Sequence, residues 1–342
     1  MRGFVKAAVL VAGWCLLLTA GGAAKAAKPM QIYFIDVEGG QATLIAGPSG
    51  QSLLVDTGWP EANGRDAGRI AAAAKAAGVK RIDYVLITHY HRGHVGGVTQ
   101  LASRMKIGAF VDHGPNQEDS DATRENYAAY QKVLANTKHV VVQAGDGLPL
   151  RGITVRVLTA AGEHISMPLP GMGEANPLCA SEPEAAADAG ENARSLGVLI
   201  TYGKFRFIDL GDLTKKKELE LVCPNNLVGT VDLYLVTHHG LGQSNAKAIV
   251  WVLHPRVAIM NNGAHKGGSP VAWQIVHDSP ELEDLWQLHY AVDAGKEHNV
   301  ADKFVANVDE SSDGHYIKVS AQPDGTFTVV NARNNYGKTY KK

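Results

Sequence analysis

The chain has 342 residues, and its 33 lysine and arginine residues nearly balance 34 aspartate and glutamate residues, so the formal net charge is -1. Hydrophobic residues make up 45% of the chain, which is typical of a globular protein with a sizeable core and excludes a disordered or collagen-like chain. The near-neutral charge creates no overall field that would attract nucleic acid. The length allows two domains or one large α/β unit.

Residues 1–26 have the pattern of a secretory signal peptide. Arg2 and Lys6 precede an apolar run from Ala7 to Ala20, and Ala24-Lys25-Ala26 provides an A-x-A cleavage site. The run is shorter than the ~20 residues that a membrane span needs, so we expect cleavage rather than a membrane anchor. Cleavage would leave 30 basic and 34 acidic residues, a net charge of -4. We therefore expect a secreted or periplasmic protein without general nucleic-acid binding.

The chain after the signal peptide begins with short strands separated by glycine and proline turns. An alanine-rich helix is then predicted over 66–77, followed by Gly78, a residue favoured just after a helix end. Strands alternate with one more helix in the rest of the first half. The predicted strands are 31–36, 42–46, 52–56, 83–88, 109–112, 139–143 and 153–158, and the second helix is 121–136.

Residues 162–192 interrupt this alternation with several prolines, glycines and acids. A connection of about 30 residues is longer than a simple connector, which predicts a lid over a site or a mobile insertion. The second half then resumes the alternation, and no composition break separates the halves, so we expect 27–342 to be a single domain. Its predicted strands are 196–202, 205–210, 231–236, 256–260, 316–321 and 326–330, and its predicted helices are 215–221 and a segment after Ser244.

Two cysteines, Cys179 and Cys223, follow the signal peptide. In an oxidising compartment they could form a disulfide, and two independent buried thiols are an equal alternative. Their wide separation and the lack of a C-x-x-C pair do not fit a zinc knuckle.

The H-x-H-x-x-H pattern of His89, His91 and His94 is the strongest chemical signal in the sequence. His89 and His91 alternate at the end of the apolar strand 83–88, so their imidazoles can point the same way, and His94 lies where the chain turns into a helix. Imidazoles that converge at a sheet edge are typical ligands of a zinc-like ion. The sequence therefore predicts a metal site at this strand end.

Other strand ends carry residues suited to the same site. Asp56 closes the strand 52–56, and Asp212 follows the strand 205–210 after a glycine. His238 and His239 follow the strand 231–236. Adjacent side chains of an extended strand face opposite ways, so we expect one of these histidines to bind metal and the other to contact substrate or support a ligand.

Two further segments near strand ends contain polar and aromatic residues. Lys266-Gly267-Gly268 follows the strand 256–260, and loops at such positions often line a cleft. Trp286 belongs to the segment D-L-W-Q-L-H, where it is more typical of a core residue than of a pocket wall.

The order of these motifs, an aspartate after a strand, H-x-H-x-x-H, G-D and H-H-G, resembles the metallo-β-lactamase fold superfamily over most of residues 30–330. D-V-E-G-G-Q at 36–41 and H-H-G at 238–240 are most similar to its secreted and competence-protein-type hydrolases. The resemblance implies an α/β fold, the αββα four-layer sandwich, with one or two metal ions at the sheet edge. It also implies Zn²⁺, with Mn²⁺ or Fe²⁺ as alternatives, and an activated water that attacks an ester-type bond.

By motif position, the resemblance implies a role for each residue. His89 and His91 correspond to ligands of the first ion, His94 and His239 to ligands of the second, and Asp212 to the bridging ligand. His238 is then assigned to substrate contact, and Asp56 to a brace of the site. Asp212, His238 and Asp56 are the expected catalytic residues.

The sequence departs from the superfamily pattern at two places. The superfamily motif is H-x-H-x-D-H, and Gly93 stands at the aspartate position, which removes a carboxylate of the second ion and leaves room beside Arg92. No residue matches the third histidine of the first ion. The candidates for that position are Asn192, Ser195, His113, His164 or water, although a hydrogen-bonded or surface role is favoured for the two histidines.

These patterns together predict an exported metal-dependent hydrolase. A phosphodiester or related small anionic ester is favoured as substrate over a lactam or a thioester, because of the resemblance to the competence type. The alternative is a catalytically degenerate member of the fold that binds a ligand or a metal without turnover, which Gly93 motivates. A mononuclear iron oxygenase on the same scaffold is a weaker third hypothesis.

Overall fold

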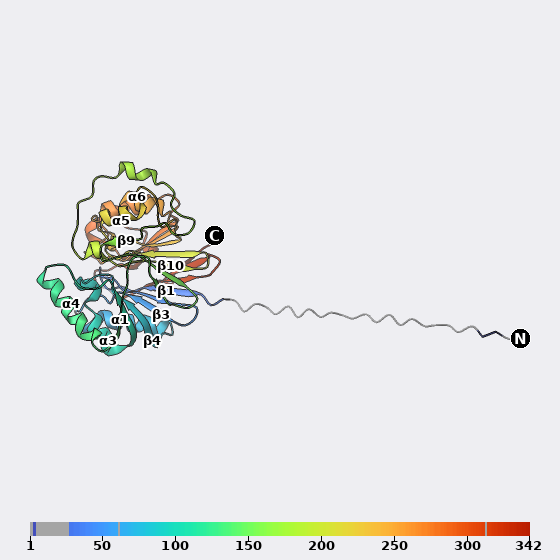
Figure 1. Cartoon of the computed structure of the whole chain (residues 1–342), viewed down its shortest axis with the longest axis horizontal. Helices are drawn as coiled ribbons and strands as arrows, with labels where there is room; N and C mark the ends of the chain where they lie inside the picture. The colour runs from blue at the N-terminus through green and yellow to red at the C-terminus, as the bar shows by residue number, and fades with distance from the viewer. Residues whose placement is uncertain (1–2, 5–26, 61, 312) are drawn as a thin grey trace.

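The computed structural model describes residues 3–4, 27–60, 62–311 and 313–342, so the predicted signal peptide lies almost entirely outside the described residues. Two β-sheets pack face to face, and helices cover the outer face of each sheet (Figure 1). This arrangement is the predicted αββα four-layer sandwich.

The first sheet is built mainly from the first half of the chain, with the C-terminal hairpin added at one edge. Its strands from β18 to β3 pair antiparallel, and those from β3 to β6 pair parallel. Among the described residues the order is β18 (Gly337–Tyr340), β17 (Phe327–Asn331), β16 (Ile317–Ala321), β1 (Met30–Phe34), β2 (Thr43–Ala46), β3 (Ser52–Val55), β4 (Arg81–Leu86), β5 (Lys106–Asp112) and β6 (Lys138–Val141).

The second sheet comes mainly from the second half of the chain, with β7, β8 and β9 from the end of the first half. Its strands from β15 to β11 pair parallel, and those from β11 to β7 pair antiparallel. The order is β15 (Val305–Asn307), β14 (Asp284–His289), β13 (Val257–Met260), β12 (Leu233–Leu235), β11 (Phe205–Asp209), β10 (Gly197–Tyr202), β8 (Thr154–Ala160) and β7 (Gly147–Leu148), and β9 (Glu163–His164) also pairs with β8.

Each outer layer is formed by amphipathic helices. In α1, the buried Ala67, Ile70 and Ala74 recur at helical spacing and pack against the first sheet, while the other face meets solvent. The first layer contains α1 (Arg65–Ala76), α2 (Arg92–Val95), α3 (Val98–Arg104) and α4 (Asp121–Leu134), and the second contains α5 (Lys215–Val222), α6 (Lys247–Val252) and α7 (Pro270–His277). Short 3₁₀ turns at η1 (Ala62–Gly64), η2 (Pro177–Ser181), η3 (Asn192–Arg194), η4 (Thr237–Gly240), η5 (Val292–Ala294), η6 (Lys296–His298) and η7 (Asp302–Phe304) complete the connections.

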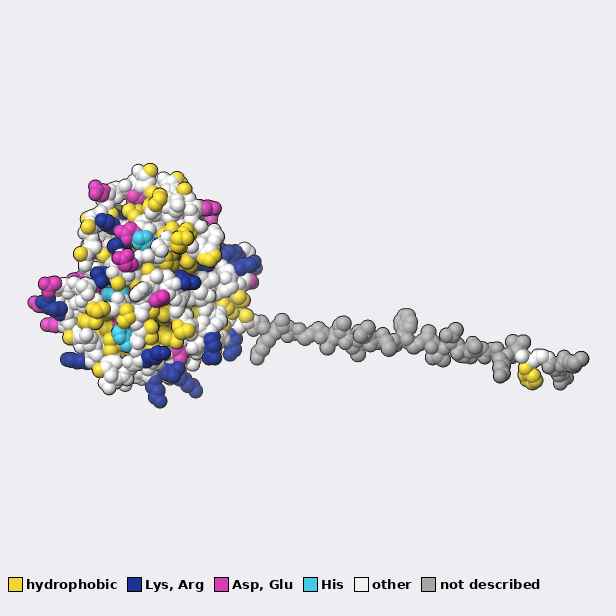
Figure 2. All heavy atoms as spheres, viewed as in Figure 1, with side chains coloured by type: hydrophobic (Ala, Val, Ile, Leu, Met, Phe, Trp, Pro, Cys, Tyr) yellow, Lys and Arg dark blue, Asp and Glu magenta, His cyan; other side chains and the backbone are white. Residues whose placement is uncertain are grey.

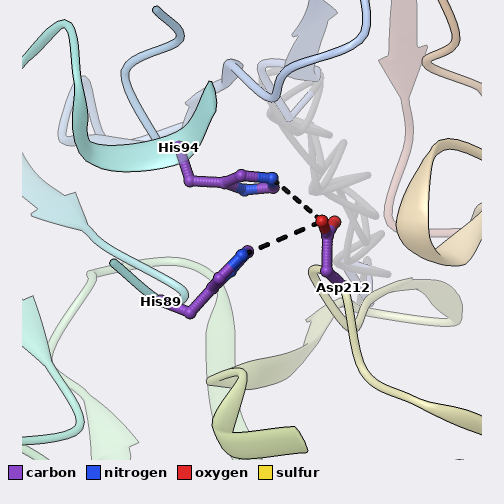
Figure 3. Close-up of side chains that lie close together, drawn as sticks. All are labelled: His89, His94 and Asp212. Carbon is purple, nitrogen blue, oxygen red and sulfur yellow. Dashed lines mark ion pairs between the residues drawn. The ribbon is translucent and has the colours of Figure 1, made fainter. Parts of the chain in front are cut away.

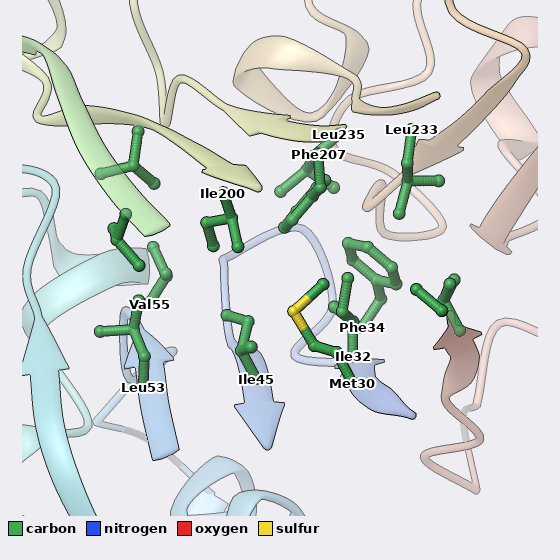
Figure 4. Close-up of a cluster of buried hydrophobic side chains, with 14 of the residues drawn as sticks. Met30, Ile32, Phe34, Ile45, Leu53, Val55, Ile200, Phe207, Leu233 and Leu235 are labelled. Atoms are coloured by element: carbon green, nitrogen blue, oxygen red, sulfur yellow. The ribbon is translucent and has the colours of Figure 1, made fainter. Parts of the chain in front are cut away.

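The central core lies between the two sheets, where alternate strand residues point inward from both sides (Figure 4). Ile32 and Phe34 of β1 face this layer together with Ile200 of β10 and Phe207 of β11. The rings of Phe34 and Phe207 meet edge to face, with their centroids 5.6 Å apart. This apolar layer holds the sheets in a fixed relation, so residues at the ends of their strands are held in register across the molecule.

The predicted helices and strands correspond to observed elements with ends shifted by a few residues, but several elements were not predicted. Trp286 is fully buried on β14, and Tyr340 on β18 is 1% exposed, so both belong to the core.

The long segment 162–192 packs on the second helical layer, where Cys179 forms a disulfide with Cys223 at the end of α5. The structure therefore contains the disulfide and not the two independent buried thiols that were the alternative.

The described surface carries both signs of charge. In the face shown in Figure 2, Lys and Arg side chains gather along the lower edge, below the positions of α1, α3 and β4 in Figure 1. Within the described ranges, none of the helices combines the length and the apolar character needed to cross a membrane.

Candidate metal centre

The candidate site lies where strands of the two sheets end beside each other. β3 and β4 run parallel in the first sheet, and β11 and β12 run parallel in the second. Polar loops at the carboxyl ends of parallel strands are the usual location of sites in α/β proteins. The segments after these four strands carry Asp56, the H-x-H-x-x-H cluster, Asp212 and the two adjacent histidines.

The first half of the chain contributes an aspartate and three imidazoles. Asp56 follows β3, His89 follows β4, and His91 is the N-cap of α2, where its backbone is still extended. His94 lies within α2 and therefore returns toward His89, because the helix turns between the two positions. Asp56, His89 and His94 are fully buried, whereas the His91 side chain is 34% exposed.

The second half contributes Asp212 and two histidines. Asp212 follows Gly211, whose φ of 57° and tight packing against Thr88 suit a glycine. His238 and His239 do not continue an extended strand, because β12 ends at Leu235 and both residues have left-handed backbone, with φ of 54° and 55°. The expectation that adjacent histidines must face opposite ways was wrong for this reason, since both imidazoles reach Asp212.

Four imidazoles surround the Asp212 carboxylate. Figure 3 shows His89 and His94 directed at it from the opposite side of the site. The Oδ2 atom lies 3.2 Å from Nε2 of His94, 3.3 Å from Nε2 of His238 and 3.8 Å from Nε2 of His89. The Oδ1 atom lies 3.3 Å from Nε2 of His239. His91 joins through His89, since its Nδ1 lies 3.1 Å from Nε2 of His89.

Hydrogen bonds on the far side of the imidazoles determine which nitrogen carries the proton when each ring is neutral. Nδ1 of His94 lies 2.7 Å from Oδ2 of Asp56, and a carboxylate can only accept. Thr88 donates its hydroxyl to Asp56, so Nδ1 of His89, 3.0 Å from that hydroxyl oxygen, donates to it. The Nε2 lone pairs of His89 and His94 are therefore directed toward Asp212.

His91 and His238 are oriented in the same way. Nε2 of His91 lies 3.2 Å from Oε2 of Glu118, which leaves Nδ1 to face His89. Ser244 donates its hydroxyl to the backbone oxygen of Leu213, so Nδ1 of His238, 3.1 Å away, donates to Ser244. Hydrogen bonds of this kind on the second nitrogen are typical of metal-binding histidines.

These residues fit a metal ion. Two ligand atoms at tetrahedral positions, each about 2.0–2.1 Å from one ion, lie about 3.3 Å apart, which is close to the separations observed here. His94 Nε2, Asp212 Oδ1 and His239 Nε2 are buried and have no hydrogen-bond partner in the described part of the chain. One ligand atom from each of His89, His94 and Asp212 lies within 4.8 Å of the other two. Converging lone pairs and orphaned buried atoms are what a cation would satisfy.

The charges of the cluster shift several pKa values. Burial lowers the pKa of His94, but the carboxylates of Asp212 and Asp56 outweigh burial and raise it to about 9. Burial raises the pKa of Asp212, but His94, His239 and His238 hold it well below its usual value. Burial lowers the pKa of His89, and lowers that of His239 to about 4. Without an ion, His94 and Asp212 therefore form a buried ion pair.

The position of the missing carboxylate is filled by another side chain. A Cβ atom added to Gly93 would lie 2.9 Å from Cζ2 of Trp59 and 3.3 Å from the Cα atom of Gly40. The expectation that Gly93 leaves room beside Arg92 was therefore wrong, because the indole already occupies that space. Arg92 itself is exposed.

The candidates for the third ligand of the first ion lie at different places. Nε2 of His113 is 3.1 Å from Glu191, and Nδ1 of His164 is 3.5 Å from Glu220, so both histidines have carboxylate partners of their own. The backbone N–H of Asp212 donates to the hydroxyl of Ser195, which supports Asp212 rather than an ion. Asn192 has a buried Oδ1 without a partner among the described residues and stays a candidate.

Some residues at the site could not be found from motifs. Glu118 is near His91 because the loop after β5 folds back, and Trp59 reaches Gly93 from the loop before α1. Ser244 lies five residues after His239, and its closeness in sequence to H-H-G is a signal that could have found it.

The long segment 162–192 borders a pocket beside this centre. The pocket has a volume of about 550 Å³ and lies between residues 182–188 and the start of α5. Its lining includes Asn192 and Thr214, and Thr214 is two positions after Asp212. The segment therefore lies where a lid would lie, although lid movement stays a prediction.

Comparison with known proteins agrees with the motifs. The Metallo-beta-lactamase superfamily model matches residues 35–171. ComE operon protein 3 of Bacillus subtilis (strain 168) is 24% identical over 254 residues, 68% of this chain and 28% of that protein. Recombination protein 2 of Haemophilus influenzae is 23% identical over 264 residues, 77% of this chain and 27% of that protein. The chain thus spans little more than a quarter of the curated relatives that it matches.

Among solved structures, the metallo-beta-lactamase fold protein YhfI from Bacillus subtilis is 14% identical, with 76% of this chain and 95% of that chain covered and a TM-score of 0.44. The architecture, the strand-end motifs and the matched sequence model point to the same conclusion. The chain has the metallo-β-lactamase fold and resembles the competence-type proteins of that superfamily.

Proposed function

We propose that the protein is a metal-dependent hydrolase of ester-type bonds. The observation that carries this proposal is the convergence of four imidazoles on the buried carboxylate of Asp212, with three ligand atoms that lack a hydrogen-bond partner among the described residues. The proposed ligands are His89, His91, His94, Asp212 and His239. A divalent ion held there would lower the pKa of a bound water to about 7, and so provide a nucleophile at neutral pH.

The other polar residues would keep this centre in shape. Asp56 accepts hydrogen bonds from His94 and Thr88, and so holds one ligand and, through Thr88, the His89 ring. His238 is held by Ser244 and directs Nε2 toward Asp212, where it could bind the ion or receive a proton during hydrolysis. Both adjacent histidines reach Asp212, so the assignment of His238 to substrate contact stays a prediction.

The preferred substrate class in this proposal is a phosphodiester or a related small anionic ester. The preference over lactams and thioesters is supported by the resemblance to competence-type proteins. The pocket of about 550 Å³ beside Thr214 is large enough for a small molecule.

The test combines metal analysis of the purified chain with turnover of phosphodiester, lactone and β-lactam reporters. We expect at least one zinc or manganese ion per chain, turnover of the phosphodiester, and loss of both in His89→Ala. The matched control is His277→Ala, since His277 is exposed at the end of α7. Less than half an ion per chain and no turnover of any reporter would overturn the proposal.

A second candidate function is a ligand- or metal-binding protein without turnover. The observation that favours it is Trp59, which fills the space where the superfamily carboxylate would begin at Gly93. Stoichiometric metal with no turnover of any reporter would favour this function. Bound iron with oxygen consumption would instead favour an oxygenase.

We also propose that the protein is exported. The support is the signal-peptide pattern of residues 1–26 and the Cys179–Cys223 disulfide, since disulfides persist mainly in oxidising compartments. N-terminal sequencing of the protein recovered from the periplasm or the medium should show a start near residue 27. An exported protein that still begins at Met1 would contradict the signal-peptide assignment.

A further inference from the structure

The loop that follows β13 is attached directly to the turn that carries His239. The backbone N–H of Gly268 donates to the carbonyl of His239 at 2.8 Å, and the N–H of Ser269 donates to the carbonyl of Gly240 at 2.9 Å. A Cβ atom on Gly267 would lie 2.2 Å from the same His239 carbonyl, so only a glycine lets the two backbones approach this closely. The position of Lys266 is therefore coupled to that of a proposed metal ligand.

The side chain of Lys266 is held against the opposite half of the molecule. A Cβ atom on Gly39 would lie 2.8 Å from Cβ of Lys266, so the lysine stem packs on the bare backbone there. Its Nζ atom lies 4.7 Å from the ring centroid of Trp59, within the range of a cation–π contact. The same indole packs on Gly93, so the ammonium lies next to the residue that replaces the missing carboxylate.

The charge of Lys266 acts on the metal centre. Burial lowers the pKa of Lys266, and the Asp212 carboxylate acts in the opposite direction. Burial also lowers the pKa values of His238 and His239, and the Lys266 charge lowers both further. The attachment of the Lys266 loop to His239 and the contact with Trp59 keep this partly buried ammonium beside the proposed centre. Because it lies over an aromatic face, it has given up part of its hydration and can accept an anion at lower cost.

We propose that Lys266 binds the anionic group of the substrate beside the metal centre, and that Trp59 positions it there. This inference rests on the proposed function. It specifies the substrate class, because the substrate must carry a negative charge next to the cleaved bond. An ammonium is a compact point charge with three donors and suits a phosphate oxygen. In this arrangement the indole that packs on Gly93 also holds the Lys266 ammonium, and that positive charge is available to an anion.

The experiment measures binding of inorganic phosphate to the zinc-loaded protein by calorimetry. We expect Lys266→Met to weaken phosphate binding by about 10- to 100-fold, the loss of one charge-assisted hydrogen bond, with zinc content unchanged. Lys266→Arg should retain part of the affinity, and Trp59→Leu should give an intermediate loss. The matched control is Lys247→Met, because Lys247 lies 3.8 Å over the ring of Trp251 on α6 in a second cation–π pair.

Steady-state kinetics distinguish binding of a substrate phosphodiester from binding of free phosphate. In Lys266→Met the KM for bis(p-nitrophenyl) phosphate should rise about 10-fold or more, while Lys247→Met leaves it unchanged. If phosphate binds more weakly and KM does not change, Lys266 binds free phosphate, and its role toward substrate is overturned.

Failure of this inference can be told apart from failure of the proposed function. Unchanged phosphate affinity in Lys266→Met with normal zinc content overturns the role of Lys266 alone. A wild-type protein that holds no zinc and turns over no reporter overturns the proposed function instead. Circular dichroism and melting curves check folding, and Lys266→Gln replaces Lys266→Met if the latter does not fold.

Discussion

The two halves of the molecule hold their histidines in different ways. In the first half, His89, His91 and His94 come from ordinary strand-end and helical backbone, and a hydrogen bond on the far nitrogen orients each ring. In the second half, His238 and His239 are placed by a left-handed backbone turn. His238 has a hydrogen bond on its far nitrogen, and His239 has no such partner in the described part of the chain.

The left-handed turn of the second half needs support, because non-glycine residues in this conformation cost of order 1–3 kcal/mol each. The support comes from behind the turn. Both carboxylate oxygens of Glu218 accept backbone N–H groups, from Asn245 and Ala246, at 2.9 Å. The side chain of Asn245 in turn donates to the carbonyl of Thr237 at 2.9 Å. Side-chain hydrogen bonds therefore orient the histidines of the first half, whereas a braced backbone orients those of the second.

The largest expected effect tests this brace through pH. Burial raises the pKa of Glu218 from 4.5 to about 7, although the backbone N–H groups of Ala246 and Asn245 act in the opposite direction. A folded-state pKa above the unfolded value means that the folded protein binds the extra proton. The stabilisation is therefore complete below about pH 4.5 and is lost as the pH rises through about 7. The loss should amount to about 3 kcal/mol of unfolding free energy.

Denaturant unfolding of the wild type between pH 4.5 and 8 measures this loss. Across this range Glu218→Gln should lose about 3 kcal/mol less unfolding free energy than the wild type, while Asp209, whose pKa burial also raises to about 7, keeps its contribution in both proteins. Glu220→Gln, at a partly buried position of the same helix, should keep the wild-type pH dependence. A Glu218→Gln variant that keeps the full wild-type pH dependence would show that the carboxylate of Glu218 is not destabilised by its burial.

A smaller effect is expected when the ring-orienting hydrogen bonds of the two halves are removed. Asp56→Asn should weaken zinc affinity by about 10- to 100-fold, because the amide replaces one accepting oxygen by an NH₂ group, which would face either the backbone N–H of Thr88 or the ring N–H of His94. Ser244→Ala should cost less than about 10-fold if backbone rather than this hydrogen bond places His238. Zinc titration against a chromophoric chelator measures both, with the exposed Ser103→Ala as control. Equal losses in the two variants would contradict the comparison.

The last prediction concerns Gly93, which contacts Trp59. Gly93→Asp should destabilise the protein by about 1–3 kcal/mol, because its Cβ atom would meet Trp59 at 2.9 Å. Gly68→Asp is the control, since Gly68 is also helical and its nearest neighbour is Arg104 at 3.6 Å. In a double-mutant cycle, Trp59→Ala should relieve part of the loss. Unchanged stability in Gly93→Asp would show that the indole moves aside freely.

The sequence by itself predicted most helices and strands, and its resemblance to a known superfamily implied the layers of the fold and the residues of the candidate site. Strand and helix periodicity located β4, β11 and their neighbours, and the spacing of His89, His91 and His94 is local, so a short window contains it. The aspartate and histidine motifs at other strand ends could be combined because parallel strands of a known fold bring their ends together. Local patterns of this kind need no knowledge of distant contacts.

The tertiary structure decided what depends on contacts between distant segments. Three contacts join residues that no local pattern relates: the disulfide between Cys179 and Cys223, the contact of Glu118 with His91, and the pairing of β1 with β16. The left-handed turn at His238 and His239 was not predicted, because backbone support from Glu218 outweighs the local preference of histidine. The filled space beside Gly93 was not predicted either, because it depends on which side chain packs there, and that side chain is Trp59.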